Sequence, residues 1–164
     1  MNLFALLWLL LGTSLVLGTE RWKNPVIPCA LKENEDPVKQ FPYGNDVGTA
    51  AGMQEFCNRM QERFSQSDLS ATEAKKVYAA LFAARWLREG SYGMPSPDLP
   101  PTKPLTLDDY KKRVALRKIS DNSYEVYYAY LNCGTNYEYA QVWVEAGKVS
   151  RQERLEAWSG SYPC

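Results

Sequence analysis

Histidine is absent from this chain of 164 residues. Its absence excludes Ser–His and Cys–His nucleophilic pairs and mixed cysteine–histidine zinc sites. An excess of either charge is also lacking, because 19 Lys and Arg balance 19 Asp and Glu. A nucleic-acid binder needs a basic excess that releases counterions from phosphates, so we expect no nucleic-acid partner. The GxGxxG, P-loop and CxxC motifs are missing too, and we expect no bound cofactor or metal ion.

The first 18 residues carry no charged side chain and include an apolar run from Leu3 to Leu11. A run of this length is typical of a secretory signal, with cleavage expected between Gly18 and Thr19. An uncleaved anchor is the alternative, although the run is shorter than the roughly 20 residues that span a bilayer. We therefore expect a secreted or periplasmic protein, or a membrane-anchored one with an extracytoplasmic domain if residues 1–18 are retained.

The chain has four cysteines: Cys29, Cys57, Cys133 and Cys164. An even number in an exported chain favours two disulfides over four buried thiols, and the sequence permits three pairings. The preferred pairing is Cys29–Cys57 with Cys133–Cys164. The first bond would hold an N-terminal arm on a helix, and the second would tie the C-terminal tail to the end of a sheet.

Residues 19–46 are expected to form an extended arm, because four prolines interrupt any regular element. Residues 47–164 are expected to form a single α+β domain. A proline-rich loop at 91–105 divides that domain.

Two helices are predicted before this loop. The first has an apolar stripe at helical spacing, made of Met53, Phe56, Cys57, Met60 and Phe64. The second begins at Ser70, because a serine followed three residues later by Glu73 is a capping box. Few residues join the two helices, which favours an antiparallel helix pair. A short third helix is predicted from Thr106, where the same capping pattern recurs.

From residue 113 onward the pattern changes to period two and predicts four strands: 114–119, 124–133, 137–145 and 148–158. Turns are expected at 120–123, at 134–136 and at Ala146-Gly147. The fold class is therefore α+β, with two antiparallel helices followed by a four-stranded antiparallel meander. This element order is similar to that of cystatin-like and NTF2-like domains, and the similarity concerns element order only.

Aromatic residues concentrate in the predicted sheet. We predict one Tyr/Trp-rich face that binds a partner, because such side chains combine a large contact area with a polar tip. A turn at Ala146-Gly147 would place Tyr139 opposite Arg154 and Val144 opposite Val149. Ordinary cross-strand aromatic packing is the structural alternative. The predicted partner-binding residues are Tyr124, Tyr128, Tyr130, Tyr137, Tyr139, Trp143 and Arg154.

These observations favour a non-enzymatic binding domain that engages a protein partner as an inhibitor or immunity-type factor. A small-molecule carrier with a pocket between the helices and a curved sheet is the first alternative. A membrane-anchored envelope assembly component is the second. An enzyme could still use paired carboxylates or, in principle, a Ser–Lys pair, although no Ser-x-x-Lys motif occurs. The glutamates of the sheet region show no pairing and are expected to be solvated: Glu125, Glu138, Glu145, Glu153 and Glu156.

Overall fold

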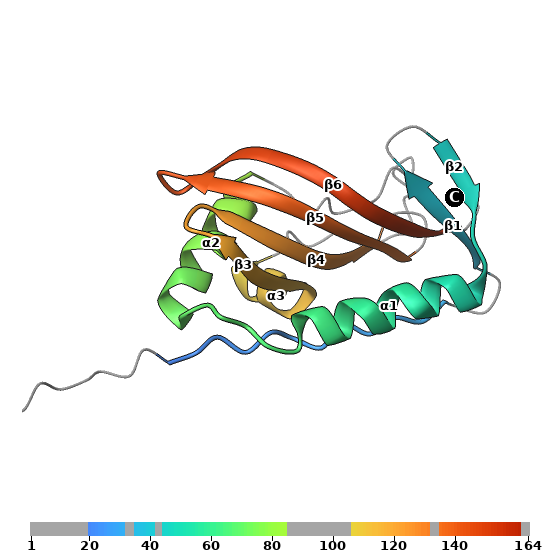
Figure 1. Cartoon of the computed structure of the whole chain (residues 1–164), viewed down its shortest axis with the longest axis horizontal. Coiled ribbons are helices and arrows are strands. Elements are labelled where there is room, and N and C mark those ends of the chain that lie inside the picture. Colours follow the sequence, from blue (N-terminus) through green and yellow to red (C-terminus); the bar gives the residue numbers. More distant parts are fainter. Residues whose placement is uncertain (1–19, 32–34, 42–43, 85–105, 132–134, 162–164) are drawn as a thin grey trace, which may run out of the picture.

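The computed structural model describes residues 20–31, 35–41, 44–84, 106–131 and 135–161. These residues form three helices and a six-stranded antiparallel sheet, which is an α+β fold (Figure 1). The helices are α1 (Ala50–Phe64), α2 (Ala71–Ala83) and α3 (Leu107–Arg113). In their order across the sheet, the strands are β2 (Gly44–Val47), β1 (Asp36–Phe41), β6 (Lys148–Ser161), β5 (Thr135–Glu145), β4 (Ser123–Leu131) and β3 (Val114–Ser120).

The predicted helices form where their capping and apolar patterns place them. All five residues of the predicted stripe on α1 are buried. At the start of α2, the Ser70 hydroxyl accepts a hydrogen bond from the backbone N–H of Glu73 at 3.1 Å. Helix α3 begins with a complete capping box between Thr106 and Asp109. These caps satisfy backbone N–H groups that have no partner within the helix.

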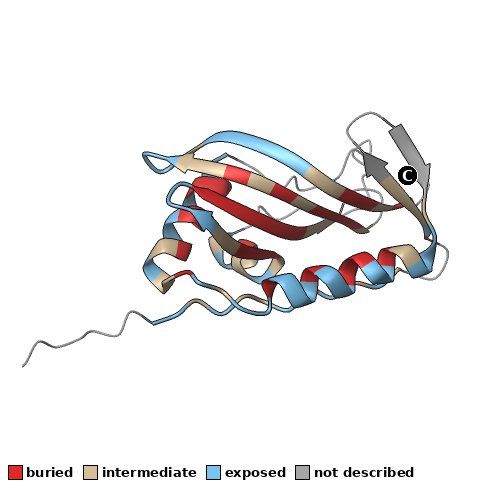
Figure 2. Ribbon diagram, viewed as in Figure 1, coloured by how far each residue is buried: buried red, intermediate tan, exposed pale blue. Residues whose placement is uncertain are grey.

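Helices α1 and α2 lie on opposite faces of the sheet, so the predicted antiparallel helix pair is wrong. Strand β4 shows the reason. Val126 packs in one apolar cluster with α2, and the next residue, Tyr127, packs in a second cluster with α1. Because successive side chains of a strand point to opposite faces, both faces of β4 are apolar and each needs a covering helix. Figure 2 shows buried residues on both α1 and β4. We call the side of the sheet that α1 covers the α1 face, and the side that α2 covers the α2 face.

The four predicted C-terminal strands form the expected meander, with the turn at Ala146-Gly147. Both turn residues have positive φ angles, 48° and 74°, as a tight two-residue hairpin turn requires. Val144 lies opposite Val149 as predicted. Two β-bulges between β5 and β6 then shift the register, so Tyr139 lies opposite Glu156 and not opposite Arg154.

Two further strands, β1 and β2, extend the sheet beyond the predicted four. They come from the segment that we expected to be an irregular arm, where Pro37 argued against a strand. In the structure Pro37 pairs with Gly160 of β6 on one side, whereas the pairing of β1 with β2 covers only Val38 to Phe41. Proline is tolerated at that position because the missing N–H falls beyond the end of the neighbouring strand.

The arm at 20–31 runs beside α1 and crosses the edge of β3. The predicted disulfide Cys29–Cys57 is confirmed and joins this arm to α1, with the two Cα atoms 5.9 Å apart. The Asn24 side chain donates to the Leu116 carbonyl at 2.9 Å and accepts from the Leu116 N–H at 2.8 Å. It thereby satisfies backbone groups that β3, as an edge strand, would otherwise leave unpaired.

Several sequence predictions fall outside the described residues. They are the export segment at 1–18, the proline-rich loop at 91–105, and the pairing of Cys133 with Cys164. Within the described part of the chain, none of the helices has the length and apolar character needed to cross a bilayer.

Candidate recognition surface

The predicted aromatic face is divided between the two sides of the sheet. Tyr124 and Tyr128 are buried on the α2 face, where Tyr130 is half-buried and stacks on Tyr128 with ring centroids 5.8 Å apart. Tyr137 is buried on the α1 face, and its hydroxyl donates to the Ala30 carbonyl at 3.3 Å. The rings of Tyr124, Tyr128 and Tyr137 therefore stabilise the core and offer no surface for a partner.

Arg154 does not lie on the same face of the sheet as Tyr139 and Trp143. The β-bulge before it turns its side chain to the α2 face, where it forms an ion pair with Glu138. Tyr139 and Trp143 stay on the α1 face and are partly exposed. The Arg151 guanidinium lies over the Trp143 ring, 4.4 Å from its centroid, in a cation–π contact.

The α1 face also holds a buried carboxylate that the sequence did not reveal. Glu125 of β4 was expected to be solvated, yet only 5% of its surface is exposed. Arg63 of α1 donates to both of its oxygens, from Nε at 2.8 Å and from Nη2 at 2.5 Å. Arg117 of β3 donates at 2.9 Å, and the Tyr139 hydroxyl of β5 donates at 2.6 Å. One helix and three strands thus meet at a single carboxylate.

These contacts set the protonation of the cluster. Burial alone raises the pKa of the Glu125 carboxyl, but hydrogen bonds from Arg63, Tyr139 and Arg117 outweigh it and hold the pKa below its ordinary value. Burial, together with the hydrogen bond to Glu125, raises the pKa of Tyr139 to about 12. At neutral pH, Glu125 is therefore an anion, and it lacks the raised pKa that a carboxylic general acid needs.

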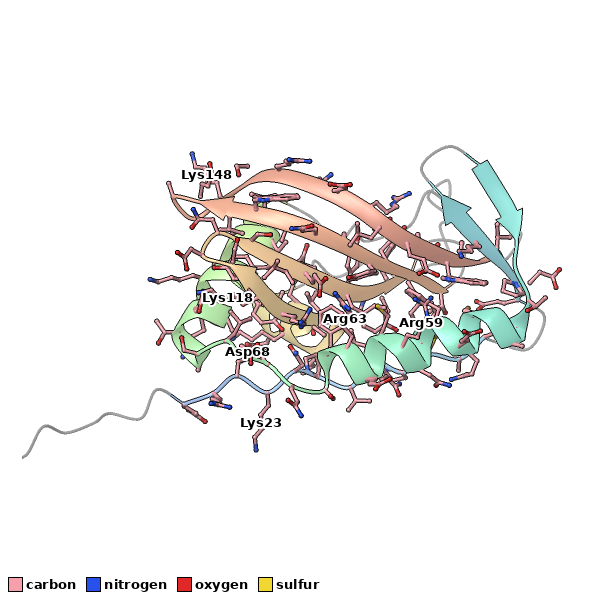
Figure 3. All side chains as sticks on the ribbon, in the orientation of Figure 1. Lys23, Arg59, Arg63, Asp68, Lys118 and Lys148 are labelled. Carbon is pink, nitrogen blue, oxygen red and sulfur yellow. A yellow bond between two sulfur atoms is a disulfide. The ribbon has the colours of Figure 1, made fainter. Side chains whose placement is uncertain are left out.

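A second carboxylate anchors another arginine of α1. Arg59 Nη2 donates to both oxygens of Glu156, at 3.1 and 3.0 Å. Lys39 of β1 lies 3.6 Å from the same carboxylate, and the Trp158 ring nitrogen donates to it at 3.1 Å. Figure 3 shows Arg59 and Arg63 on the side of α1 that faces the sheet.

These arginines surround a surface hollow of about 450 Å³, lined by Arg59, Met60, Glu62, Arg63, Arg117 and Tyr139. We call it the arginine hollow. The carboxylates lie beneath, with side-chain exposures of 7% for Glu125 and 12% for Glu156. The guanidinium-bearing side chains are far more exposed, at 51% for Arg59, 42% for Arg63 and 34% for Arg117. Positive groups therefore face solvent while their counter-charges are withdrawn into the protein.

No family model, curated protein or solved structure matches this chain. Within the described segments, no group of three or more cysteine, aspartate and glutamate side chains is arranged to hold a metal ion.

The candidate recognition surface consists of the arginine hollow and, further along the same face of the sheet, Trp143 and Arg151. The sequence predicted Tyr139 and Trp143. It did not reveal the arginines, because residues 59, 63 and 117 meet only after α1 has packed across the sheet. A usable signal was the position of Glu125 between Tyr124 and Val126, since a charge within an apolar strand calls for a buried partner.

Proposed function

We propose that this chain is an exported, disulfide-stabilised and non-enzymatic domain that binds a protein partner, in the manner of an inhibitor or immunity-type factor. The observation that carries the proposal is that Tyr139, Trp143 and four arginines lie on the same side of the sheet, the side that α1 covers. Tyr, Trp and Arg are the residues most enriched among those that dominate the energy of protein interfaces. Their joint exposure on a rigid sheet supports recognition over a purely structural role.

The rigidity of the surface supports the same proposal. Each arginine of the hollow is held by a carboxylate below it, so little side-chain freedom remains to be lost when a partner binds. Export is supported by the Cys29–Cys57 bond, since structural disulfides persist in oxidising compartments, and by the uncharged apolar segment at 1–18.

A small-molecule carrier is the second candidate, and one cavity favours it. A space of about 270 Å³ lies between the arm, α1 and strands β3 and β4, lined by residues that include Ile27, Phe64 and Tyr127. Pockets that enclose drug-sized ligands usually measure about 300–1,000 Å³. The cavity volume is thus slightly below that range, and we rank carriage below protein recognition.

Partner capture tests the proposed function. The purified, oxidised chain would be immobilised and exposed to an extracytoplasmic extract from its source. The captured protein would then be purified and its affinity measured directly. We expect Trp143→Ala to weaken that affinity by tenfold or more, as loss of an interface anchor does.

Phe82→Ala is the matched control, because Phe82 is a partly exposed aromatic residue on α2, which packs on the other face of the sheet. Equal affinities for wild type and Trp143→Ala, in variants of unchanged fold, would exclude this surface. Circular dichroism and thermal unfolding would establish that the fold is unchanged.

A further inference from the structure

Some hydrogen-bond donors of the arginine hollow are not used by the carboxylates beneath it. Arg63 binds Glu125 through Nε and Nη2, and Arg117 binds it through Nη1. Arg63 also interacts with the Tyr139 hydroxyl, whereas the Nε and Nη2 groups of Arg117 have no hydrogen-bond partner among the described residues. A guanidinium presents five N–H donors in a rigid fork that matches a carboxylate. The inward-facing donors are thus used for positioning, and the remaining ones are free for a ligand.

The charge around the hollow limits the kind of anion that fits. Three guanidinium groups line it, but Glu62 lies on its rim and Glu153 is exposed on the same face of β6. The whole chain has no net charge. A polyanion such as a nucleic-acid backbone would meet these carboxylates, whereas a single anionic group would meet only the arginines. The hollow suits one carboxylate at a time.

The neighbouring aromatic residue places a second requirement on the ligand. Tyr139, at the hollow, and Trp143 are on the same face of β5, four residues apart. At about 3.3 Å per residue, the two positions are separated by roughly 13 Å. An extended peptide lying along β5 would span this distance with side chains four residues apart. The geometry therefore favours an acidic side chain at one position and an apolar one four residues away.

Resting on the proposed function, we propose that the arginine hollow receives an aspartate or glutamate side chain from an acidic segment of the protein partner. Arg59, Arg63 and Arg117 bind its carboxylate, and Trp143 packs against an apolar side chain four residues further along the segment.

Two peptides that differ by one charge test this proposal. The probe is the capped pentapeptide acetyl-Glu-Gly-Ser-Gly-Trp-amide, and its control has glutamine in place of glutamate. Binding to the purified, oxidised chain would be followed by NMR, using the arginine Nε–Hε signals and the Trp143 indole signal. We expect the glutamate peptide to bind about tenfold more tightly, as a charge-assisted hydrogen bond implies. We also expect it to shift the signals of Arg63 and Arg117.

Two substitutions locate the preference in the hollow. Arg59→Gln leaves Glu156 with Lys39 and the Trp158 ring nitrogen, so the fold is expected to survive. Arg117→Gln leaves Glu125 with Arg63 and Tyr139. Each variant should lose most of the preference for glutamate over glutamine, whereas Lys76→Gln, on an exposed part of α2, should keep it.

Equal binding of the two peptides, or a preference that survives both arginine substitutions, would overturn the proposal. Inorganic phosphate that displaces the glutamate peptide at equal concentration would also overturn it, because the hollow would then be a site for free anions. The proposed function can hold even where this further proposal fails. If Trp143→Ala abolishes partner binding while both arginine variants bind normally, protein recognition stands and the acidic-segment inference fails.

Discussion

Glu125→Gln removes one negative charge from beneath two arginines and leaves the side-chain shape nearly unchanged. The wild-type carboxylate accepts four hydrogen bonds, two from Arg63 and one each from Arg117 and Tyr139. Breaking a buried ion pair costs about 3–5 kcal/mol. Both arginines are more than one third exposed, so solvent screens part of this interaction. We expect Glu125→Gln to lower the free energy of unfolding by about 2–3 kcal/mol.

Urea unfolding followed by circular dichroism measures this loss. With a slope of about 2 kcal/mol per molar urea, the midpoint should fall by roughly 1–1.5 M. Glu153→Gln is the matched control, since Glu153 also pairs with an arginine, Arg151 at 3.3 Å, but both side chains are more than half exposed. Its cost should stay below about 1 kcal/mol. A Glu125→Gln variant that loses no more stability than Glu153→Gln would refute the reasoning.

The pH dependence gives an independent check. The pKa of Glu125 is lowered in the folded state, so its stabilising contribution is complete above the pKa of the unfolded chain, about 4.3 for glutamate. The contribution is lost as the pH falls through the lower folded-state pKa. The stability difference between wild type and Glu125→Gln should therefore be constant near neutral pH and shrink below about pH 4. A difference that persists unchanged at pH 3 would contradict this assignment.

Three further substitutions test other parts of the fold. The double substitution Cys29→Ser and Cys57→Ser removes a disulfide between residues 28 positions apart. The loop-entropy relation predicts that the free energy of unfolding falls by about 3.5 kcal/mol, measured by denaturant unfolding. Unchanged stability would contradict this prediction. Asn24→Ala removes three hydrogen bonds to backbone groups and should lower the free energy of unfolding by about 1–3 kcal/mol. Because the edge of β3 would then be unpaired, we also expect self-association in sedimentation experiments. A monomer of wild-type stability would argue against the protection of this edge by Asn24. Gly48→Ala would place a Cβ atom 2.1 Å from the Trp158 ring and should cost about 1–3 kcal/mol in thermal unfolding, an expectation that an unchanged melting temperature would disprove.

Local patterns predicted the elements whose formation depends on nearby residues. The stripe on α1, the caps of α2 and α3 and the hairpin at Ala146-Gly147 all lie within short stretches of chain, and the structure contains each of them. The strands β1 and β2 were missed because β1 depends on pairing with β6, from which it is remote in sequence. The prolines of this segment also argued against any regular element there.

The placement of the helices and the site could not be predicted for a different reason. In β4 nearly every residue is apolar or aromatic, so a period of two does not tell which face is the core. The register of β6 changes at two bulges that no residue type announces. Residues 63, 117, 125 and 139 converge only through these long-range choices. The aromatic residues of the candidate recognition surface could be predicted from the sequence, and its arginines could not.

The position of β6 inside the sheet has a consequence for the order in which the chain can fold. This strand follows every other described element in the sequence, yet it lies between β1 and β5. Val38 pairs with Ser159, about 120 positions further along, and such distant pairings are formed late because closing a long loop is entropically costly. During synthesis, the hairpin of β1 and β2 therefore has no neighbouring strand in the sheet until residues 148–161 have been made. Removing residues 157–161 would leave β1 without its partner strand, whereas the rest of β6 would stay paired with β5.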